Sequence, residues 1–326
     1  METLFISAKE IVELVSMREL IDAIEEVMIL KGRGEVVMPE KTYVELPRGD
    51  FRVMPCFIEK YGMACTKVVS VCPDNRTLNL PTVQAILVLL DGTTGSPIAV
   101  MDGTTITSLR TGAAGAVAVK YLTDVKKRVK IGMVGAGTQA RSQFSAIREV
   151  VKEVEEVRVM DINPTVAKRF AEELSSLGFR SVVVDSAREA VDGVDIIVTT
   201  TTARGPVVID EWVRDGVHIN AIGADAPGKQ ELDPRILKRA KIFVDDLTQA
   251  SQSGEINVPL SQGILSLRDV SGELSDVMVG RISGRSSNKD VTVFDSTGLA
   301  IWDLAMARMV YNRARECGAG RSVSLY

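Results

Sequence analysis

The sequence predicts an α/β protein in which a domain with a mostly antiparallel sheet precedes a doubly wound parallel sheet. Three patterns support this prediction. A glycine-rich turn at residues 135–140 joins an apolar strand to a helix, strand and helix patterns alternate after that turn, and polar and apolar side chains alternate within residues 41–101 before it. Two domains are therefore expected, the first with a mostly antiparallel sheet and the second with alternating strands and helices.

The first expected elements are two short helices within residues 7–31. Apolar residues recur there at helical spacing. Ser7 with Glu10, and Ser16 with Glu19, have the spacing of capping boxes, which predicts a helix start at each serine.

A β-hairpin is expected next, because residues 41–46 and 51–54 alternate in polarity on either side of a Pro-Arg-Gly-Asp turn. Further strands are predicted at 63–70, 83–90 and 97–101. These strands follow one another closely, as antiparallel strands do.

Alanine and glycine dominate residues 108–121, which suits a helix packed closely against another backbone. A polar hinge is expected at 124–128. The two features mark the passage from the first domain to the second.

The apolar strand at 129–134 runs into Gly-Ala-Gly-Thr-Gln-Ala, the G-x-G-x-x-A fingerprint of dinucleotide-binding folds. Gly135 permits the tight turn, Gly137 lets a pyrophosphate approach the backbone, and Ala140 lets the helix pack on the strand. The helix, expected over 143–151, offers its N-terminal dipole to phosphates. A dinucleotide site explains this context better than a turn without a ligand.

Asp161 ends the next predicted strand, at 156–161. A carboxylate there can accept hydrogen bonds from both ribose hydroxyls and would repel a 2′-phosphate, so NAD is expected. The nearby Asn163 and Arg169 leave NADP open as an alternative.

Strands and helices continue to alternate after Asp161, which predicts the parallel sheet. Ligand contacts are then expected at the carboxyl ends of the strands, within 199–202, 223–225 and 295–298. The helices are predicted at 165–177, 186–191 and 300–317, and the strands at 181–184, 195–200, 217–222, 241–244 and 291–294. The last helix leaves the sheet late enough to return to the first domain.

The composition and charge of the chain argue against several classes of protein. The net charge of −4 shows no basic surface for nucleic acid or an anionic membrane. The N-terminus does not resemble a signal peptide, and no apolar run is long enough to span a bilayer. The four cysteines lack metal-binding spacing, so free thiols in the cytoplasm and no metal are expected.

Four cations are candidates for binding a substrate carboxylate: Lys41, Arg52 and Lys67 in the β-rich segment and Arg110 in the helix of small residues. Lysine and arginine are seldom buried unless paired, so a solvent-facing Lys67 is the plain alternative.

Acid–base chemistry needs another group, because the single histidine, His218, begins a strand and is expected to be structural. A lysine or carboxylate with a shifted pKa would take that role. Asp225 is a candidate at a strand end, although an aspartate that only forms a turn is common there.

Five motifs resemble the ornithine cyclodeaminase/mu-crystallin family. They are Ser-Leu-Arg-Thr-Gly-Ala at 108–113, the fingerprint at 135–140, His-Ile-Asn-Ala-Ile-Gly-Ala-Asp at 218–225, Pro-Gly-Lys-Gln-Glu-Leu at 227–232 and Phe-Asp-Ser-Thr-Gly at 294–298. The resemblance covers essentially the whole chain.

This resemblance implies a substrate-binding and dimerisation domain at 1–122, joined by the returning C-terminal helix at 302–326, and an NAD(P)-binding Rossmann-type domain at 123–301. It implies a homodimer formed through the β-rich domain.

Within the family, Met-Pro-Glu-Lys at 38–41 and Phe-Arg-Val-Met-Pro at 51–55 resemble the archaeal-type alanine dehydrogenases. The ornithine cyclodeaminases carry arginine in place of Lys41 and an acidic residue in place of Arg52. Arg52 would repel the distal ammonium of ornithine. Residues 72–79 depart from the sequence motif that is usual in both groups, which leaves the identity of the substrate open.

The activity implied is NAD-dependent deamination of a small L-amino acid, first L-alanine to the keto acid pyruvate and ammonium. Lys67 would assist proton transfer and Asp225 would activate water, while Lys41, Arg52 and Arg110 would bind the carboxylate. The implied cofactor contacts are Thr111, Gly135, Ala136, Gly137, Thr138, Gln139, Asp161, Asn163, Thr200, Thr201, Gly223 and Ser296. The alternatives are an ornithine or lysine cyclodeaminase with tightly held NAD, a cyclic imine (ketimine) reductase, and a crystallin-like binding protein.

Overall fold

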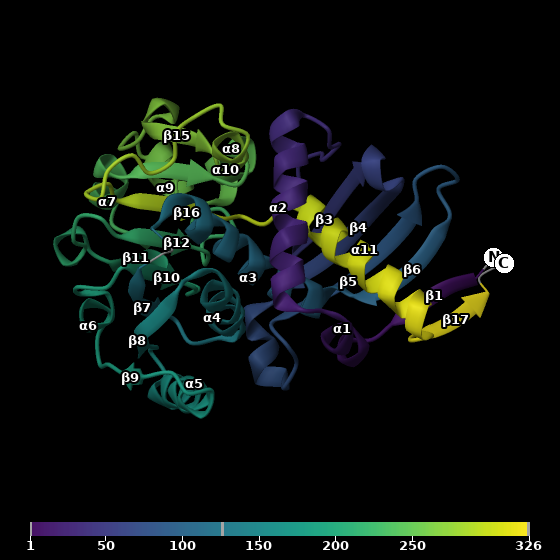
Figure 1. Ribbon diagram of the computed structural model, residues 1–326, viewed down its shortest axis with the longest axis horizontal. Coiled ribbons are helices and arrows are strands. Elements are labelled where there is room, and N and C mark those ends of the chain that lie inside the picture. The colour runs from purple at the N-terminus through teal and green to yellow at the C-terminus, as the bar shows by residue number, and fades with distance from the viewer. Residues whose placement is uncertain (1, 125–126, 325–326) are drawn as a thin grey trace. The chain divides into compact units, whose positions relative to one another are not determined.

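The computed structural model describes residues 2–124 and 127–324 (Figure 1). The chain forms two compact units: unit 1 comprises Met1–Thr111 and Leu299–Tyr326, and unit 2 comprises Gly112–Gly298. Part of the hinge expected at 124–128 lies outside the described residues.

Unit 1 is built on a seven-stranded sheet with the order β17-β1-β6-β5-β4-β3-β2. Its neighbouring strands are antiparallel except for β1 and β6, which run parallel. The strands are β1 (Glu2–Ile6), β2 (Thr42–Leu46), β3 (Gly49–Ile58), β4 (Met63–Val71), β5 (Val83–Asp91), β6 (Pro97–Asp102) and β17 (Arg321–Ser324). The expected hairpin and the mostly antiparallel sheet are confirmed.

The two helices expected within residues 7–31 are both present in unit 1, but only the first is short, since the second has 17 residues. The helices of unit 1 are α1 (Ala8–Leu14), α2 (Met17–Arg33) and α11 (Ala300–Cys317), with 3-10 turns at Glu59–Tyr61 and Pro73–Leu78. Ser7 and Glu10 form the predicted capping box. The second box is wrong, because the Ser16 side chain makes no cap hydrogen bond.

The returning C-terminal helix is present in unit 1. Helix α11 packs against α2 and against β3, β4 and β5, and the yellow helix crosses the sheet strands in Figure 1. Strands β1 and β17 were not foreseen, because each is short and finds its partner at the opposite end of the chain.

Unit 2 confirms the parallel sheet. Its eight strands have the order β15-β14-β16-β12-β10-β7-β8-β9, and every pair is parallel. They are β7 (Arg128–Val134), β8 (Glu153–Met160), β9 (Ser181–Val183), β10 (Ile196–Thr199), β12 (His218–Ala221), β14 (Lys241–Val244), β15 (Val270–Glu273) and β16 (Thr292–Asp295). Strands β11 (Arg204–Val208) and β13 (Gln230–Leu232) form a separate parallel pair.

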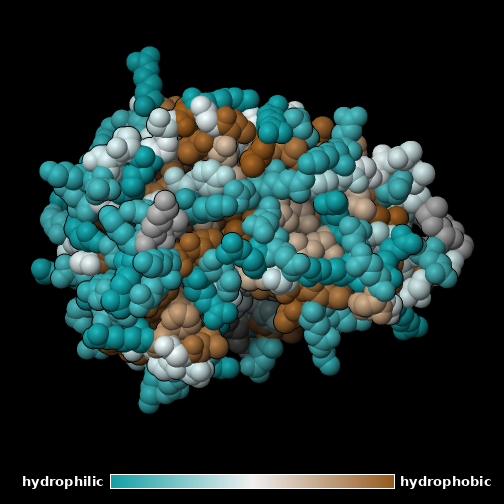
Figure 2. Space-filling view, in the orientation of Figure 1, coloured by the Kyte–Doolittle hydropathy of each residue, from teal (hydrophilic) through white to brown (hydrophobic). Residues whose placement is uncertain are grey.

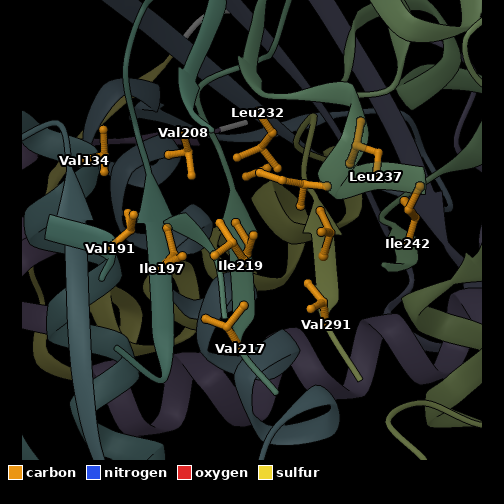
Figure 3. Packing of buried hydrophobic residues seen from close by; sticks show 14 of the residues in the cluster. Val134, Val191, Ile197, Val208, Val217, Ile219, Leu232, Leu237, Ile242 and Val291 are labelled. Carbon is orange, nitrogen blue, oxygen red and sulfur yellow. The ribbon is translucent and has the colours of Figure 1, made fainter. Parts of the chain in front are cut away.

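Helices cover the sheet of unit 2 and bury its apolar side chains. Figure 3 shows part of this core, in which Ile197 and Ile219 come from the neighbouring strands β10 and β12 and Val291 directly precedes β16. The helices are α4 (Thr138–Val150), α5 (Pro164–Ser176), α6 (Ala187–Val191), α7 (Pro234–Arg239), α8 (Leu247–Ser253), α9 (Asn257–Ser261) and α10 (Leu274–Met278), with 3-10 turns at Asp210–Trp212 and Leu267–Asp269.

The division between the units lies inside helix α3 (Gly103–Leu122), whereas the sequence analysis placed it after residue 122. The C-terminal half of α3 packs within unit 2: a Cβ on Gly112 would lie 2.3 Å from the carbonyl oxygen of Ser142, and one on Gly115 would lie 2.0 Å from Gln143 Oε1. These glycines allow α3 and α4 to approach closely.

His218 has the structural role expected of it. Its ring is fully buried between Thr292 Oγ1 and Asn220 Oδ1, each 2.9 Å away. Burial lowers the pKa of His218 to about 3, so the ring is neutral at physiological pH.

Hydrophilic residues cover most of the face drawn in Figure 2, with apolar residues between them. In the described part of the chain, no helix has the length and apolar character needed to cross a membrane.

Candidate functional site

The candidate substrate residues lie in unit 1, on the sheet face that α11 covers. Arg52 lies opposite Val69 and Lys67 lies opposite Met54 across the β3–β4 pair. Arg52 and Lys67 are therefore diagonal neighbours on one face. The face is buried, since Lys67 is 0% and Arg52 5% exposed.

Lys67 and Arg110 share one buried carboxylate, that of Asp303 on α11. Lys67 Nζ lies 2.8 Å from Asp303 Oδ2, and Arg110 Nε donates to Asp303 Oδ1 at 2.9 Å. The solvent-facing alternative for Lys67 is thus wrong. The sequence analysis did not identify Asp303, although an aspartate between Ile301, Trp302 and Leu304 was a signal of a buried charge.

Arg110 keeps hydrogen-bonding capacity after this pairing. Its guanidinium lies over the Trp302 ring, 5.4 Å from the centroid. Its Nη1 is buried and has no hydrogen-bond partner among residues 2–124 and 127–324. A buried, unpaired guanidinium nitrogen is costly, so an anionic ligand at this position would be bound strongly.

The environment of Lys67 lowers the pKa of its ammonium group to about 7. Burial is the largest cause, and the charge of Arg110 adds to it, as does that of the half-buried Lys41. Asp303 acts in the opposite direction. A lysine with a pKa near 7 can both accept and donate a proton at neutral pH.

Arg52 is held by its own hairpin. Its Nε donates to Asp50 Oδ1 at 2.6 Å and its guanidinium lies 5.2 Å from the centroid of the Tyr43 ring. Asp50, expected only as a turn residue, thus neutralises part of the Arg52 charge. The charge of Lys41 helps to lower the pKa of Lys67, and Arg52 lies on the same sheet face as Lys67.

Apart from Thr111, which belongs to unit 1, the candidate cofactor residues lie in unit 2, at or just after the carboxyl ends of the strands. Gly135 has φ +97°, and a Cβ there would lie 2.8 Å from Thr200 Oγ1. Gly137 begins helix α4 without a side-chain cap, and a Cβ there would meet no atom within 4 Å. The backbone of the fingerprint is therefore open to a phosphate group.

Asp161 lines a small cleft of about 150 Å³. Its carboxylate accepts from the backbone N–H groups of Ala136 and Asn163, both at 2.8 Å, which fixes its direction. The cleft is lined by Met160, Asp161, Ile162, Pro164, Ala167, Val183, Val184 and Asp185. Two carboxylates in this lining disfavour a 2′-phosphate, in agreement with NAD.

The other predicted cofactor residues differ in whether their side chains already form hydrogen bonds within the protein. Gln139 Oε1 and Ser296 Oγ are buried without hydrogen-bond partners in the described part of the chain, as atoms awaiting a ligand would be. Asn163 caps α5 by accepting from Thr165 N–H, and Thr111 Oγ1 donates to the Thr107 carbonyl oxygen in unit 1. Thr138 is exposed at the start of α4.

Two acidic residues follow strand β12 or lie close to it in the chain. Asp225 is half-buried and forms an ion pair with Lys229, with 2.5 Å between Asp225 Oδ1 and Lys229 Nζ. Glu231, on β13, is fully buried and accepts from Thr201 N–H and Gly223 N–H. Both Lys229 and Glu231 occur in a motif quoted above, but neither was assigned a role from the sequence.

No group of three or more metal-ligating side chains occurs in residues 2–124 and 127–324.

Comparison with known proteins agrees with this geometry. The model of the ornithine cyclodeaminase/mu-crystallin family matches residues 1–318. The chain belongs to this family. The resemblance carried by the five motifs is therefore confirmed.

Among curated proteins, the alanine dehydrogenase of Archaeoglobus fulgidus is 46% identical over 326 residues, covering 100% of this chain and 99% of that protein. Other curated relatives are named Δ1-pyrroline-2-carboxylate reductase and cyclodeaminase, so the family includes both NAD-dependent oxidoreductases and cyclodeaminases.

Two solved structures are similar over nearly their whole length. An archaeal alanine dehydrogenase dimer with bound NAD has a TM-score of 0.96 and 45% identity, covering 100% of each chain. The Thermococcus litoralis Δ1-pyrroline-2-carboxylate reductase with NADH and L-proline has a TM-score of 0.95 and 39% identity, covering 98% of this chain and 100% of that one. The prediction of NAD agrees with both.

We predict that Gly137→Leu abolishes NADH binding without loss of folding. The new side chain meets no protein atom but occupies the approach to the fingerprint backbone. NADH titration followed by nicotinamide fluorescence should show affinity reduced at least about a hundredfold, with an unchanged melting temperature.

Gly205→Leu is the matched control, since a Cβ on Gly205 also meets no atom within 4 Å. Full NADH affinity in Gly137→Leu would show that the pyrophosphate does not approach this backbone.

Proposed function

We propose that the protein catalyses the NAD-dependent oxidative deamination of a small L-amino acid, with L-alanine as the first candidate. The observation that supports this most directly is the buried cluster of Lys67, Arg110 and Asp303. It holds two cations around one carboxylate and leaves Arg110 Nη1 unpaired in the described structure.

The charges of this cluster suit the carboxylate of an amino acid. When Lys67 is protonated, two buried cations against a single buried anion leave a net positive charge, which is unfavourable in a low-dielectric interior. A substrate carboxylate on Arg110 would bring the second negative charge. Lys41, which interacts with Lys67, would add to the attraction.

Proton transfer would be divided between Lys67 and Asp225. When bound, NAD accepts a hydride from the Cα of the amino acid. Lys67, with its pKa near 7, would take the proton released from the substrate amine and later donate one. Asp225, held by Lys229, would accept a proton from the water that attacks the iminium carbon.

Arg52 favours a short, uncharged side chain on the substrate. It is 5% exposed and only partly neutralised by Asp50. A distal ammonium, as in ornithine or lysine, would meet a like charge there. Alanine is therefore a better candidate substrate than the diamino acids.

A cyclic imine reductase is the second candidate. The observation that favours it is the similarity in fold to a Δ1-pyrroline-2-carboxylate reductase. A cyclic imine also presents one carboxylate, so the Arg110 position would suit it. A cyclodeaminase, which would use NAD without net reduction, is disfavoured by Arg52.

The proposed activity predicts that NADH absorbance at 340 nm appears with L-alanine and NAD, and disappears with pyruvate, ammonium and NADH. The panel should include L-ornithine, L-lysine, L-proline and cyclic imines. Release of proline and ammonium from ornithine without NADH would instead identify a cyclodeaminase. Oxidation of NADH only by cyclic imines would identify the reductase.

The pKa of Lys67 predicts opposite pH limbs for the two directions. Oxidation needs Lys67 in its neutral amine form, so kcat/KM for alanine should fall as pH drops below about 7. Reductive amination needs the ammonium, so its rate should fall as pH rises above about 7. Both profiles can be measured by NADH absorbance.

Lys67→Arg should lower kcat about 10²- to 10⁴-fold and remove the limb near pH 7, because arginine stays protonated. Lys60→Arg is the control, since Lys60 pairs with Glu26 on the surface. An unchanged limb in Lys67→Arg would assign the titration to another group.

We further propose that the chain forms a homodimer through the outer face of the unit 1 sheet. Large apolar side chains on this face are 36–48% exposed, and the face lies opposite the one that carries Lys67. They are Phe5, Val44, Leu46, Val68 and Ile86. A contiguous apolar face of this kind is typical of an interface, and the similar archaeal alanine dehydrogenase is described as a dimer.

The dimer is tested by sedimentation equilibrium. The native protein should have twice the 35.3 kDa chain mass, and Val68→Asp with Ile86→Asp should reduce it to that of one chain. Val182→Asp, at a residue 39% exposed in unit 2, is the control. A doubly substituted protein that stays dimeric would place the interface elsewhere.

A further inference from the structure

Four fully buried carboxylates lie at or near the carboxyl ends of the unit 2 strands: Glu231, Glu255, Asp295 and Asp245, each 0% exposed. Each accepts hydrogen bonds from backbone N–H groups of a neighbouring segment. Buried carboxylates need such donors, because an unsatisfied charge in the interior is costly.

Glu231 joins the ends of two neighbouring strands. Its Oε2 accepts from Thr199 Oγ1 at 2.7 Å and from Gly223 N–H at 2.8 Å. Its Oε1 accepts from Thr201 N–H at 2.6 Å. One side chain thus holds the segments that follow β10 and β12.

The other three carboxylates extend this arrangement along the chain. Glu255 accepts from the backbone N–H groups of Glu231 and Leu232, with 2.7 Å to the latter. Asp295 accepts from Glu255 N–H at 2.8 Å. Asp245 accepts from the N–H groups of Thr297 and Gly298, both at 2.7 Å.

Glu231 holds segments that are expected to contact the cofactor, and it is not among the residues that line the cleft beside Asp161. The segments it holds contain Thr200, Thr201 and Gly223, which are candidate cofactor residues. In parallel α/β sheets the ligand binds outside the carboxyl ends of the strands, at these segments. The cleft beside Asp161 belongs to other strands, β8 and β9.

We propose that Glu231 is a positioning residue for the nicotinamide end of the cofactor. It acts through the backbone at Thr201 and Gly223 and does not itself touch the ligand. A Cβ on Gly223 would lie 2.6 Å from Glu231 Oε1, so this glycine is required for the carboxylate to reach both segments. The inference rests on the proposed use of NAD.

A carboxylate is needed at this position because all of its partners can donate. Glutamine would keep the shape but replace one acceptor oxygen with an NH₂ group. That group would face the N–H of Gly223 or of Thr201, and two donors would meet. The segments would then shift by a small distance while the fold stays intact.

The test compares two ligands in the full-length protein. In Glu231→Gln, the Kd of NADH should rise at least about tenfold, whereas the Kd of ADP-ribose, which lacks nicotinamide, should stay within about twofold. Calorimetric titration measures both. Equal weakening of the two ligands, or no weakening of either, would overturn the proposal.

Two further variants separate positioning from loss of folding. Thr199→Val removes one donor to Glu231 with little change in shape, and it should weaken NADH binding in the same selective way. Asp195→Asn is the matched control, because Asp195 also accepts a backbone N–H, that of Lys130, but lies just before β10 at the amino end of the sheet. A selective effect of equal size in Asp195→Asn would overturn the proposal.

These measurements are independent of the amino-acid substrate. A protein that binds NADH but does not oxidise alanine would fail the proposed function, and the comparison of NADH with ADP-ribose would still decide the role of Glu231.

Discussion

The burial of Lys67 is the constraint on which the substrate side of unit 1 depends. A lysine side chain with no exposed surface is stable only if a partner offsets the loss of hydration. Asp303 is that partner, and it stands on the helix that returns from the end of the chain. The path of α11 is therefore tied to the chemistry of the sheet it covers.

Lys67 shares the Asp303 carboxylate with Arg110, so the ion pair does not fully neutralise either cation. Burial, with the charge of Arg110 added to it, lowers the pKa of Lys67 to about 7, and one carboxylate cannot neutralise both cations. Arg110 also keeps an unpaired nitrogen within the described residues. Either feature alone has a structural explanation, since ion pairs are common in interiors. Together they support the proposed binding of an anion at Arg110, next to a lysine that can exchange a proton.

The sequence was informative wherever chemistry is encoded locally. The fingerprint at 135–140 needs only its neighbours to be interpreted, and Arg110 stood out among small residues. Asp303 and Glu231 were given no role because their importance comes from distant partners. The Lys67–Asp303 contact joins residues 236 positions apart, and no periodicity reveals such a pair. Ser16 shows the converse, since its correct spacing did not produce a cap hydrogen bond.

Charge also explains how one fold can serve several substrates. In the proposed function, the buried cation at Arg110 binds a carboxylate, which amino acids and cyclic imino acids share. Discrimination must then come from residues that face the rest of the substrate, and Arg52 is the charged one on the same sheet face as Lys67. Asp50 holds its guanidinium at 2.6 Å, so its position is fixed before a substrate arrives. A preorganised cation rejects a second ammonium more effectively than a mobile one, because it cannot move away from the repulsion.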